Sequence, residues 1–273
     1  MIMKNNDPLL SIITICYNQS DIDETCESII AQTFQDFEWI VIDGGSTDEV
    51  LQKLEKYKKR INVFVSEKDN GRYHAMNKGI RLAKGKYLNF LNGGDSYFEV
   101  NTLEKIVNTL KYRTKINFDA DIYYGSVNLV YENEETVIRA PSKLTLMFFF
   151  RNNINHQSTI IKKSLFKKYG YYNEQTKIFG DYESWLLFLK NKCVFRKIDN
   201  VVANFKMDGI SSNYKHRQLV HERACIVRKY FTDKEINDVY FSMLRFQEKI
   251  FSIKKELDYK VIRILGLKIK YNY

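Results

Sequence analysis

The segment Lys86-Tyr-Leu-Asn-Phe-Leu-Asn-Gly-Gly-Asp95 ends a predicted strand on a carboxylate. Its apolar run, Tyr87 to Leu91, predicts a buried strand, and the two glycines that follow permit a tight turn and a close approach of the backbone. In an open α/β sheet the carboxyl ends of parallel strands form the ligand crevice. Asp95 would therefore lie where the metal that accompanies a bound anion is held, unless it is a solvated Asp in an ordinary Gly-Gly turn.

Earlier segments repeat this pattern of a buried strand followed by polar residues. Leu9 to Cys16 is a near-continuous apolar, β-branched run, which is typical of a strand covered on both faces in a parallel sheet. Phe37 to Asp43 is a second such run and also ends in a carboxylate and glycines, and Ile61 to Val65 predicts a third strand. The loop after the first strand lacks G-x-G-x-x-G, which counts against a dehydrogenase. Alternating strands and helices predict an α/β fold.

Helical patterns separate these strands. Ser20 or Asp21 can cap a helix that runs to about Gln32, and Ser46 or Thr47 can cap a second one. After Gly71 a further helix begins with Arg72 and His74 beside free backbone N–H groups. This first turn is a reasonable anion site, although a solvated helix face explains the same residues.

The chain beyond Asp95 predicts a helix over 101–112 and strands near 121–130 and 135–140. These strands alternate apolar and polar residues, which favours antiparallel edge strands that close the sheet. Further elements are an apolar helical turn over 144–150, a strand over 155–161, short strands over 194–198 and 201–205, and a mostly helical run from 216 to about 259. A helix that opens near Phe179 carries Asp181 in its first turn, where helix capping alone could explain a carboxylate.

Composition limits the class of protein. With 44% hydrophobic and 28% charged residues the chain is expected to fold, and four scattered cysteines without a CxxC pair argue against a zinc site or a disulfide framework. We expect a reducing compartment. The N-terminus has no basic segment followed by an apolar one, and no apolar run approaches 18 residues, so secretion and membrane spanning are disfavoured.

Positive charge gathers near the C-terminus. Residues 215–273 hold 14 Lys or Arg and 7 Asp or Glu of a chain with net charge +10. An anionic membrane surface or nucleic acid would match this charge, but no nucleic-acid motif accompanies it. The basic residues alternate with apolar ones, which suits the headgroup boundary of a membrane, while a helix packed on the rest of the protein would also explain them. The basic residues are Lys254, Lys255, Lys260, Arg263, Lys268 and Lys270.

Carboxylates at strand ends suit one kind of chemistry. No Ser-His-Asp, Walker, HExxH or CxxC signature competes with them. An oxygen-ligated divalent cation beside one carboxylate could neutralise a nucleotide diphosphate as it leaves. A second carboxylate that faces the reacting carbon could take the proton of an incoming hydroxyl.

Six segments carry motifs in one order over residues 9 to 212. They are Leu10-Ser-Ile-Ile-Thr-Ile-Cys-Tyr-Asn18, Val41-Ile-Asp-Gly-Gly-Ser-Thr-Asp48, Asp69-Asn-Gly-Arg-Tyr-His-Ala-Met-Asn-Lys-Gly79, Gly85-Lys-Tyr-Leu-Asn-Phe-Leu-Asn-Gly-Gly-Asp95, His156-Gln157 and Gly180-Asp-Tyr-Glu183. Together they resemble the family-2 glycosyltransferases of the GT-A fold. The resemblance is nearest to the bacterial members that build O-antigen, capsule or colanic-acid repeat units.

The resemblance implies an inverting, metal-dependent transfer from a nucleotide sugar. The metal, Mn²⁺ or Mg²⁺, would be bound by Asp95, and Asp181 would be the catalytic base. His156 and Ser211 would approach the diphosphate or the acceptor. The nucleotide sugar would be bound by Thr14, Tyr17, Asp43, Asp69, Arg72, Asn77, Lys78 and Gly94. UDP is the expected nucleotide because Asp43 suits uracil, and thymine and guanine donors stay open.

The resemblance also implies an organisation and a setting. Residues 1–212 would form a GT-A catalytic domain, with a donor and metal half (1–100) and an acceptor half (101–212), built on a mixed, mostly parallel sheet flanked by helices. Residues 213–273 would form a helical, basic extension. The acceptor would be a lipid-linked glycan or polysaccharide, and the protein would be cytoplasmic and peripheral to the inner face of the cell membrane. No nucleic-acid partner is expected, and a homodimer stays open.

The sequence departs from the family's pattern at two places, and two other functions stay open. The usual acidic cluster is reduced to Asn92-Gly93-Gly94-Asp95, which puts the identity of the metal in doubt, and position 74 is His where related sequences often have Asp. A nucleotidyltransferase shares such a sheet but would be expected to carry a Gly- and Arg-rich loop after the first strand. A non-catalytic nucleotide-binding scaffold in a polysaccharide assembly is the second alternative.

Overall fold

The computed structural model describes residues 7–207, 216–242, 261–264 and 267–270. The chain divides into two compact units, residues 1–226 and 227–273. The predicted boundary after residue 212 lies outside the described residues, and the division into donor and acceptor halves stays a prediction.

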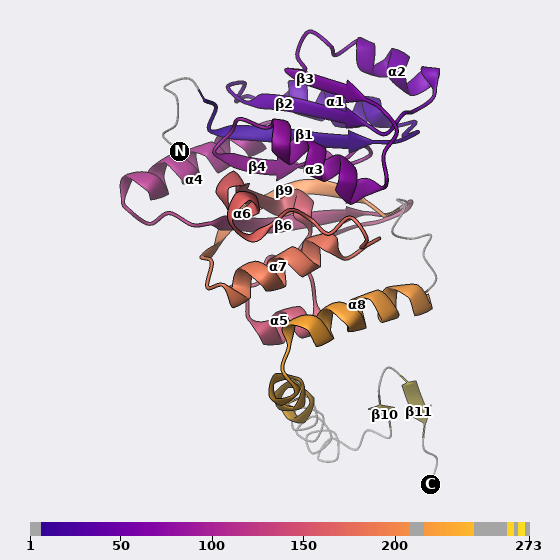
Figure 1. Ribbon diagram of the computed structural model, residues 1–273, viewed down its shortest axis with the longest axis vertical. Coiled ribbons are helices and arrows are strands. Elements are labelled where there is room, and N and C mark those ends of the chain that lie inside the picture. The colour runs from indigo at the N-terminus through magenta and orange to yellow at the C-terminus, as the bar shows by residue number, and fades with distance from the viewer. Residues whose placement is uncertain (1–6, 208–215, 243–260, 265–266, 271–273) are drawn as a thin grey trace. The chain divides into compact units, whose positions relative to one another are not determined.

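The first unit is built on a nine-stranded sheet with the order β3-β2-β1-β4-β8-β6-β9-β5, and β7 pairs with β6 (Figure 1). The first four strands are parallel neighbours and agree with the buried runs of the sequence. They are β1 (Leu10–Cys16), β2 (Glu38–Asp43), β3 (Val63–Ser66) and β4 (Tyr87–Phe90). Every residue of β1, β2 and β4 is buried, because helices cover both faces of these strands.

The second half of the sheet is mixed. β8 is antiparallel to both β4 and β6, β9 is parallel to β6, and β5 and β7 add antiparallel edges. The predicted mixed, mostly parallel sheet flanked by helices is confirmed. The bounds are β5 (Ser96–Tyr97), β6 (Ile122–Val130), β7 (Glu135–Ile138), β8 (Thr159–Lys162) and β9 (Phe195–Lys206).

Three expectations for this half were wrong. β6 is an inner strand, whose polar residues are buried and bonded: Asn128 Nδ2 donates to Asn204 Oδ1 at 2.9 Å. The two short strands expected over 194–198 and 201–205 are the single strand β9, which crosses a shift in register opposite Ser126. The strand expected from Asn155 begins with a 3-10 turn, η1 (His156–Ser158).

Helices flank both faces of the sheet. Ile22 and Cys26 of α1, Leu54 of α2 and Leu103 of α4 share one hydrophobic core with the strands. On the other face α3 lies so close to β1 that a Cβ at Gly79 would clash with Ile13. The bounds are α1 (Ile22–Ile30), α2 (Asp48–Glu55), α3 (Arg72–Leu82), α4 (Thr102–Lys115), α5 (Leu146–Arg151), α6 (Lys163–Tyr169) and α7 (Gly180–Lys190).

The predicted long C-terminal helix is interrupted. α8 (His216–Tyr230) ends before Thr232, whose hydroxyl accepts from Glu235 N at 3.2 Å while the Glu235 carboxylate accepts from Thr232 N at 2.8 Å. This capping box starts a new helix. Val261–Ile264 and Leu267–Lys270 (β10 and β11) pair as antiparallel strands, so the extension is not helical throughout. Among the described residues, no helix is long and apolar enough to cross a bilayer.

Candidate active site

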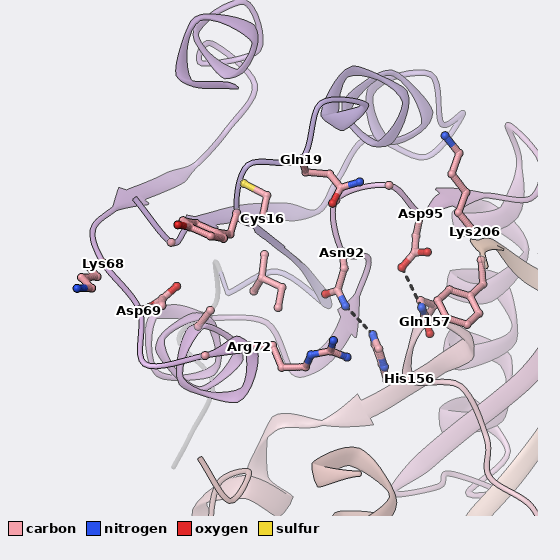
Figure 2. A pocket seen from close by; sticks show the side chains of 18 residues that line it. Cys16, Gln19, Lys68, Asp69, Arg72, Asn92, Asp95, His156, Gln157 and Lys206 are labelled. Carbon is pink, nitrogen blue, oxygen red and sulfur yellow. Dashed lines mark hydrogen bonds between the residues drawn. The ribbon is translucent and has the colours of Figure 1, made fainter. Parts of the chain in front are cut away.

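A cavity of about 410 Å³ lies at the carboxyl ends of β1 and β4 (Figure 2). It brings together six residues predicted for the site from distant parts of the chain, namely Tyr17, Asp69, Arg72, Gly94, Asp95 and His156. The rest of the lining is Ile15, Cys16, Gln19, Gly44, Lys68, Gly71, Ala75, Asn92, Gly93, Gln157, Phe205 and Lys206.

Asp95 is held in a tight turn after β4. Its N–H donates to Asn92 O at 3.0 Å, and Gly94 adopts φ +94°, a conformation that favours glycine. The carboxylate is 5% exposed and accepts from Gln157 Nε2 at 2.8 Å. Burial raises the pKa of Asp95 to about 7, although the Gln157 hydrogen bond and the nearby His156 act to lower it. The carboxylate thus lies buried in the cavity wall without a cation as an ion-pair partner among the described residues.

This environment fits a divalent cation that the substrate helps to bind. No group of three or more His, Cys, Asp or Glu among the described residues could hold a metal by itself. Asp95 provides a hard oxygen donor whose charge is unfavourable where it is buried, and a cation would remove that cost. One such donor fits a site in which phosphate oxygens and water are the other ligands.

His156 connects the cavity to Asp181. Its Nε2 lies 2.8 Å from Asn92 Nδ2, and its Nδ1 lies 3.4 Å from Asp181 Oδ2 (Figure 2 shows the Asn92 bond). Asp181 itself is not among the residues that line the cavity. The predicted base therefore lies next to the imidazole.

Packing fixes Asp181 at the start of α7. A Cβ at Gly180 would lie 2.7 Å from the Tyr73 ring, so only glycine lets this helix approach α3 so closely. The Tyr73 hydroxyl donates to Ile178 O at 2.5 Å, and Asp181 Oδ1 accepts from Tyr182 N at 2.7 Å. Burial, followed by the charge of Asp181, raises the pKa of Tyr73 well above its usual value, so Tyr73 stays a neutral partner.

A charged group lines the other end of the cavity. Asp69 Oδ1 accepts from Lys78 Nζ at 2.6 Å and lies 3.1 Å from His74 Nδ1. Lys78 Nζ also lies 2.8 Å from Glu67 Oε1. Burial acts to lower the pKa of Lys78, but the carboxylates of Asp69 and Glu67 outweigh it and raise this pKa. Lys78 thus acts through Asp69, since it does not line the cavity. Tyr17, 59% exposed, forms the rim beside Gly44.

Besides Lys78, three predicted donor residues do not line the cavity. Thr14 is fully buried, and its hydroxyl accepts from Trp39 Nε1 at 3.1 Å. Asn77 is buried, and its amide bonds both backbone polar groups of Tyr172. Neither lines the cavity, and the expectation that they contact the donor stays a prediction. Ser211 lies outside the described residues.

Asp43 is the third residue placed elsewhere. Its carboxylate is completely buried and accepts from Gly45 N at 3.1 Å, Ser46 N at 3.0 Å and Ser66 Oγ at 2.7 Å, and the Ser46 hydroxyl and the Cys16 thiol donate to it as well. These donors occupy its lone pairs. In this structure Asp43 shapes the turn after β2, and the expectation that it accepts from a base N–H stays a prediction.

Sequence reasoning gave no role to several lining residues. Gln157 and Asn92 stood inside quoted motifs, and their amide groups could have been recognised as partners for Asp95 and His156. Lys206 has no such signal, because its place in the lining follows from the pairing of β9 with β6, in which it lies opposite Val130. It forms ion pairs at 2.7 Å with Asp21 and with Glu24.

Comparison with known sequences identifies the family. Residues 11–180 match the model described as Glycosyl transferase family 2. A PGL/p-HBAD biosynthesis glycosyltransferase of Mycobacterium tuberculosis is 31% identical over 212 residues, which cover 76% of this chain and 80% of the relative. An uncharacterized glycosyltransferase of Rickettsia typhi is 30% identical over 233 residues, which cover 81% and 72%.

Solved structures share the fold. TarS 1-349 of S. aureus in complex with UDP-GlcNAc has a TM-score of 0.63 at 19% identity and covers 82% of this chain and 68% of its own. The mannosyltransferase PcManGT from Pyrobaculum calidifontis, in complex with GDP-Man and Mn²⁺, has a TM-score of 0.61 at 16% identity and covers 88% and 70%. The match spans only 36% of a longer TarS chain. The sheet is thus of the GT-A type, and the chain belongs to glycosyl transferase family 2.

Proposed function

We propose that this glycosyltransferase moves a sugar from a nucleotide-diphosphate donor, a UDP-sugar by preference, to a hydroxyl of a lipid-linked or polysaccharide acceptor in cell-surface glycan synthesis. The observation that carries the proposal is the buried Asp95 carboxylate at the strand-end cavity. The names of similar proteins support it, since one is described in complex with UDP-GlcNAc and another by PGL/p-HBAD biosynthesis.

The donor would bind along the strand ends. Tyr17 offers an exposed ring at the rim for stacking on the base, and Asp69 Oδ2 faces Gly44, 3.2 Å from the position of an added Cβ. With Asp43 engaged in its own turn, Asp69 is the carboxylate available to the base or ribose at this end. Arg72 supplies positive charge to the same cavity for the diphosphate.

Asp95 would hold the divalent cation, Mn²⁺ or Mg²⁺, and Gln157 would orient its carboxylate. When bound, the cation supplies positive charge to the departing diphosphate. The turn before Asp95 leaves no room for a side chain at position 94, since a Cβ there would lie 2.9 Å from Gln19 Nε2.

The reaction would be a single displacement. The acceptor hydroxyl attacks the anomeric carbon from the face opposite the diphosphate, so that the configuration of this carbon inverts. The proton of the hydroxyl leaves toward the Asp181 side of the cavity, where a carboxylate stabilises the positive charge that the proton brings. Asp95 and Asp181 are both buried, which keeps bulk water away from the leaving diphosphate and from the attacking hydroxyl.

Thermal unfolding in the presence of nucleoside diphosphates tests the proposal. UDP with Mn²⁺ should raise the Tm of the wild type, since a ligand at 100 times its Kd stabilises by about 2.7 kcal/mol. Asp95→Asn should lose the Mn²⁺-dependent part of the shift. Asp199→Asn, at a side chain that is 97% exposed, is the matched control and should keep it. If no nucleoside diphosphate shifts the wild type and no nucleotide sugar is consumed, the proposal is wrong.

A further inference from the structure

We propose that the side-chain oxygen of Gln19, Oε1, is a second protein ligand of the divalent cation, beside the Asp95 carboxylate. The proposal rests on the proposed function, because it concerns the cation that accompanies a nucleotide-diphosphate donor. It adds a neutral oxygen from the loop between β1 and α1 to the single carboxylate that follows β4. This loop would thereby take part in metal binding.

Gln19 lies against the turn that carries Asp95. A Cβ at Gly93 would lie 3.1 Å from Gln19 Cγ, and a Cβ at Gly94 would lie 2.9 Å from Gln19 Nε2. Side chains at these two positions would therefore push the amide away. Gln19 and Asp95 both line the cavity, and Figure 2 shows the Gln19 amide beside the turn that leads to Asp95. The two residues thus border the same end of the cavity.

A carboxylate fixes which way the Gln19 amide faces. Its Nε2 donates to Asp21 Oδ1, and because an ionised carboxylate only accepts hydrogen bonds, the NH₂ group and not the oxygen must lie on this side. Asp21 does not line the cavity, whereas Gln19 does. Oε1 is therefore the polar atom that Gln19 has left for the cavity, and it accepts no hydrogen bond from any residue that the structure describes.

Ion pairs hold Asp21 in its place. Lys206 Nζ lies 2.7 Å from Asp21 Oδ2 and 2.7 Å from Glu24 Oε2. The backbone N–H of Lys206 also bonds to the Asp95 carboxylate. One residue thus connects the support of the Gln19 amide with the carboxylate on the other side of the turn. Because Lys206 balances the charge of Asp21, Asp21 can orient the amide without competing for the cation, which is the part that partners of metal ligands commonly have.

The chemistry of these two oxygen donors favours a divalent cation. Carboxylate and amide oxygens are hard ligands, which Mg²⁺ and Mn²⁺ prefer. Gln19 is neutral, so it would add a ligand without placing a second negative charge next to the diphosphate. A sugar hydroxyl could also donate to an amide oxygen, but it would not offset the buried charge of Asp95. A cation satisfies both groups.

Binding of Mn²⁺ to the full chain in the presence of UDP tests the proposal, with the free Mn²⁺ measured by EPR. Gln19→Met keeps the length of the side chain but has no oxygen, and it should weaken Mn²⁺ binding by about tenfold or more. The Kd for UDP in the absence of metal should stay within about twofold. Gln52→Met, at an exposed position of α2, is the matched control and should bind Mn²⁺ as the wild type does.

Metal preference separates ligation from mere support of the turn. An imidazole suits Ni²⁺, whereas Mg²⁺ prefers oxygen ligands. Gln19→His should therefore raise the affinity for Ni²⁺ relative to that for Mg²⁺ by about tenfold or more over the wild-type ratio, measured by calorimetry with UDP present. Equal weakening of both metals would mean that Gln19 only supports the turn, and it would overturn the proposal.

Two further outcomes would also contradict it. If Gln19→Met binds Mn²⁺ within about twofold of the wild type, Gln19 is no ligand, while the role of Asp95 and the glycosyl transfer stand. If the variant loses as much affinity for UDP without metal as it loses for Mn²⁺, Gln19 contacts the nucleotide and not the cation. A wild type that binds neither UDP nor Mn²⁺ would instead reject the proposed function, and this proposal with it.

Discussion

Asp119 shows how one carboxylate can tie strands of the sheet together. Its Oδ1 accepts from the hydroxyls of Tyr87 at 2.6 Å and Tyr123 at 2.8 Å, and its Oδ2 lies 3.2 Å from Lys162 Nζ. Burial acts to raise the pKa of Asp119, but these hydrogen bonds and the lysine outweigh it and hold the pKa well below its usual value. The ionised form is therefore the one that stabilises the fold.

We predict that Asp119→Asn lowers the free energy of unfolding by about 1–2 kcal/mol at pH 7. Because the folded pKa lies below the usual value of 3.8, the stabilisation is present above that value and fades as the pH falls through the folded pKa. Denaturant unfolding at pH 7 and below pH 4 measures it, with Asp199→Asn as the control. A difference between wild type and variant that grew on acidification would contradict the assignment.

Asp43 and Asp95 show what a single residue does not reveal in the sequence. Both follow a buried strand and adjoin glycines, and the sequence predicted a ligand role for both. Their partners differ: the Asp43 carboxylate accepts from Ser66 of the neighbouring strand β3, while the Asp95 carboxylate accepts from Gln157, 62 residues away. Donors brought in by tertiary contacts cannot be read from the local pattern.

At the scale of elements, hydrogen bonds to α8 hold the loop that precedes Asp181 in place. The Glu222 carboxylate accepts from three consecutive backbone N–H groups, those of Lys177 at 3.0 Å, Ile178 at 2.9 Å and Phe179 at 2.7 Å. This loop leads directly into α7. Glu222 therefore sets where α7 begins, and with it the position of Asp181.

We predict a graded effect at Glu222. Glu222→Gln keeps Oε1, which bonds two of the three N–H groups, and should lose about 1 kcal/mol, whereas Glu222→Ala should lose about 3 kcal/mol. The alanine variant should also lower kcat about tenfold with little change in the Kd for UDP, because Asp181 is displaced and the donor site is not. Glu132→Gln, at an exposed site, is the control. Equal kcat in all three variants would show that the loop holds without this contact.

The elements also show where sequence patterns suffice. The strands β1, β2 and β4 could be predicted because continuous apolar runs accompany burial on both faces. The prediction that β6 is an edge strand was wrong because its inner positions hold Tyr, Ser and Asn, which pair across strands instead of facing water. The end of α8 was missed although Thr232 and Glu235 form a capping box, a local signal that the helical periodicity around it obscured.

At the scale of the whole chain, the order of motifs predicted the fold class but not the assembly of the site. The cavity collects the ends of β1 and β4, the start of α3, the turn η1 and the last residues of β9. Lys206 and Asp21 pair across 185 positions of the sequence. Sheet order, which a linear pattern does not encode, determines such neighbours.

The uneven distribution of charge along the chain is also a property of the whole molecule. We propose that the basic C-terminal residues bind an anionic membrane surface, which would bring the enzyme to a lipid-linked acceptor. Residues 215–273 hold twice as many basic as acidic residues. Each Lys near an anionic surface contributes about 1 kcal/mol, so a few of them suffice for reversible association.

Replacement of Lys254, Lys255 and Lys260 by Gln in the full chain should weaken binding to vesicles that contain anionic lipid by about 100-fold, because about 3 kcal/mol of attraction is lost. Replacement of Lys59, Lys84 and Lys115, three exposed lysines of the first unit, removes the same charge and should leave binding nearly unchanged. Vesicle sedimentation measures both, with neutral vesicles as the baseline. Equal weakening by the two triple variants would mean that net charge, and not the C-terminal segment, attracts the membrane, and the peripheral location proposed here would have to be abandoned.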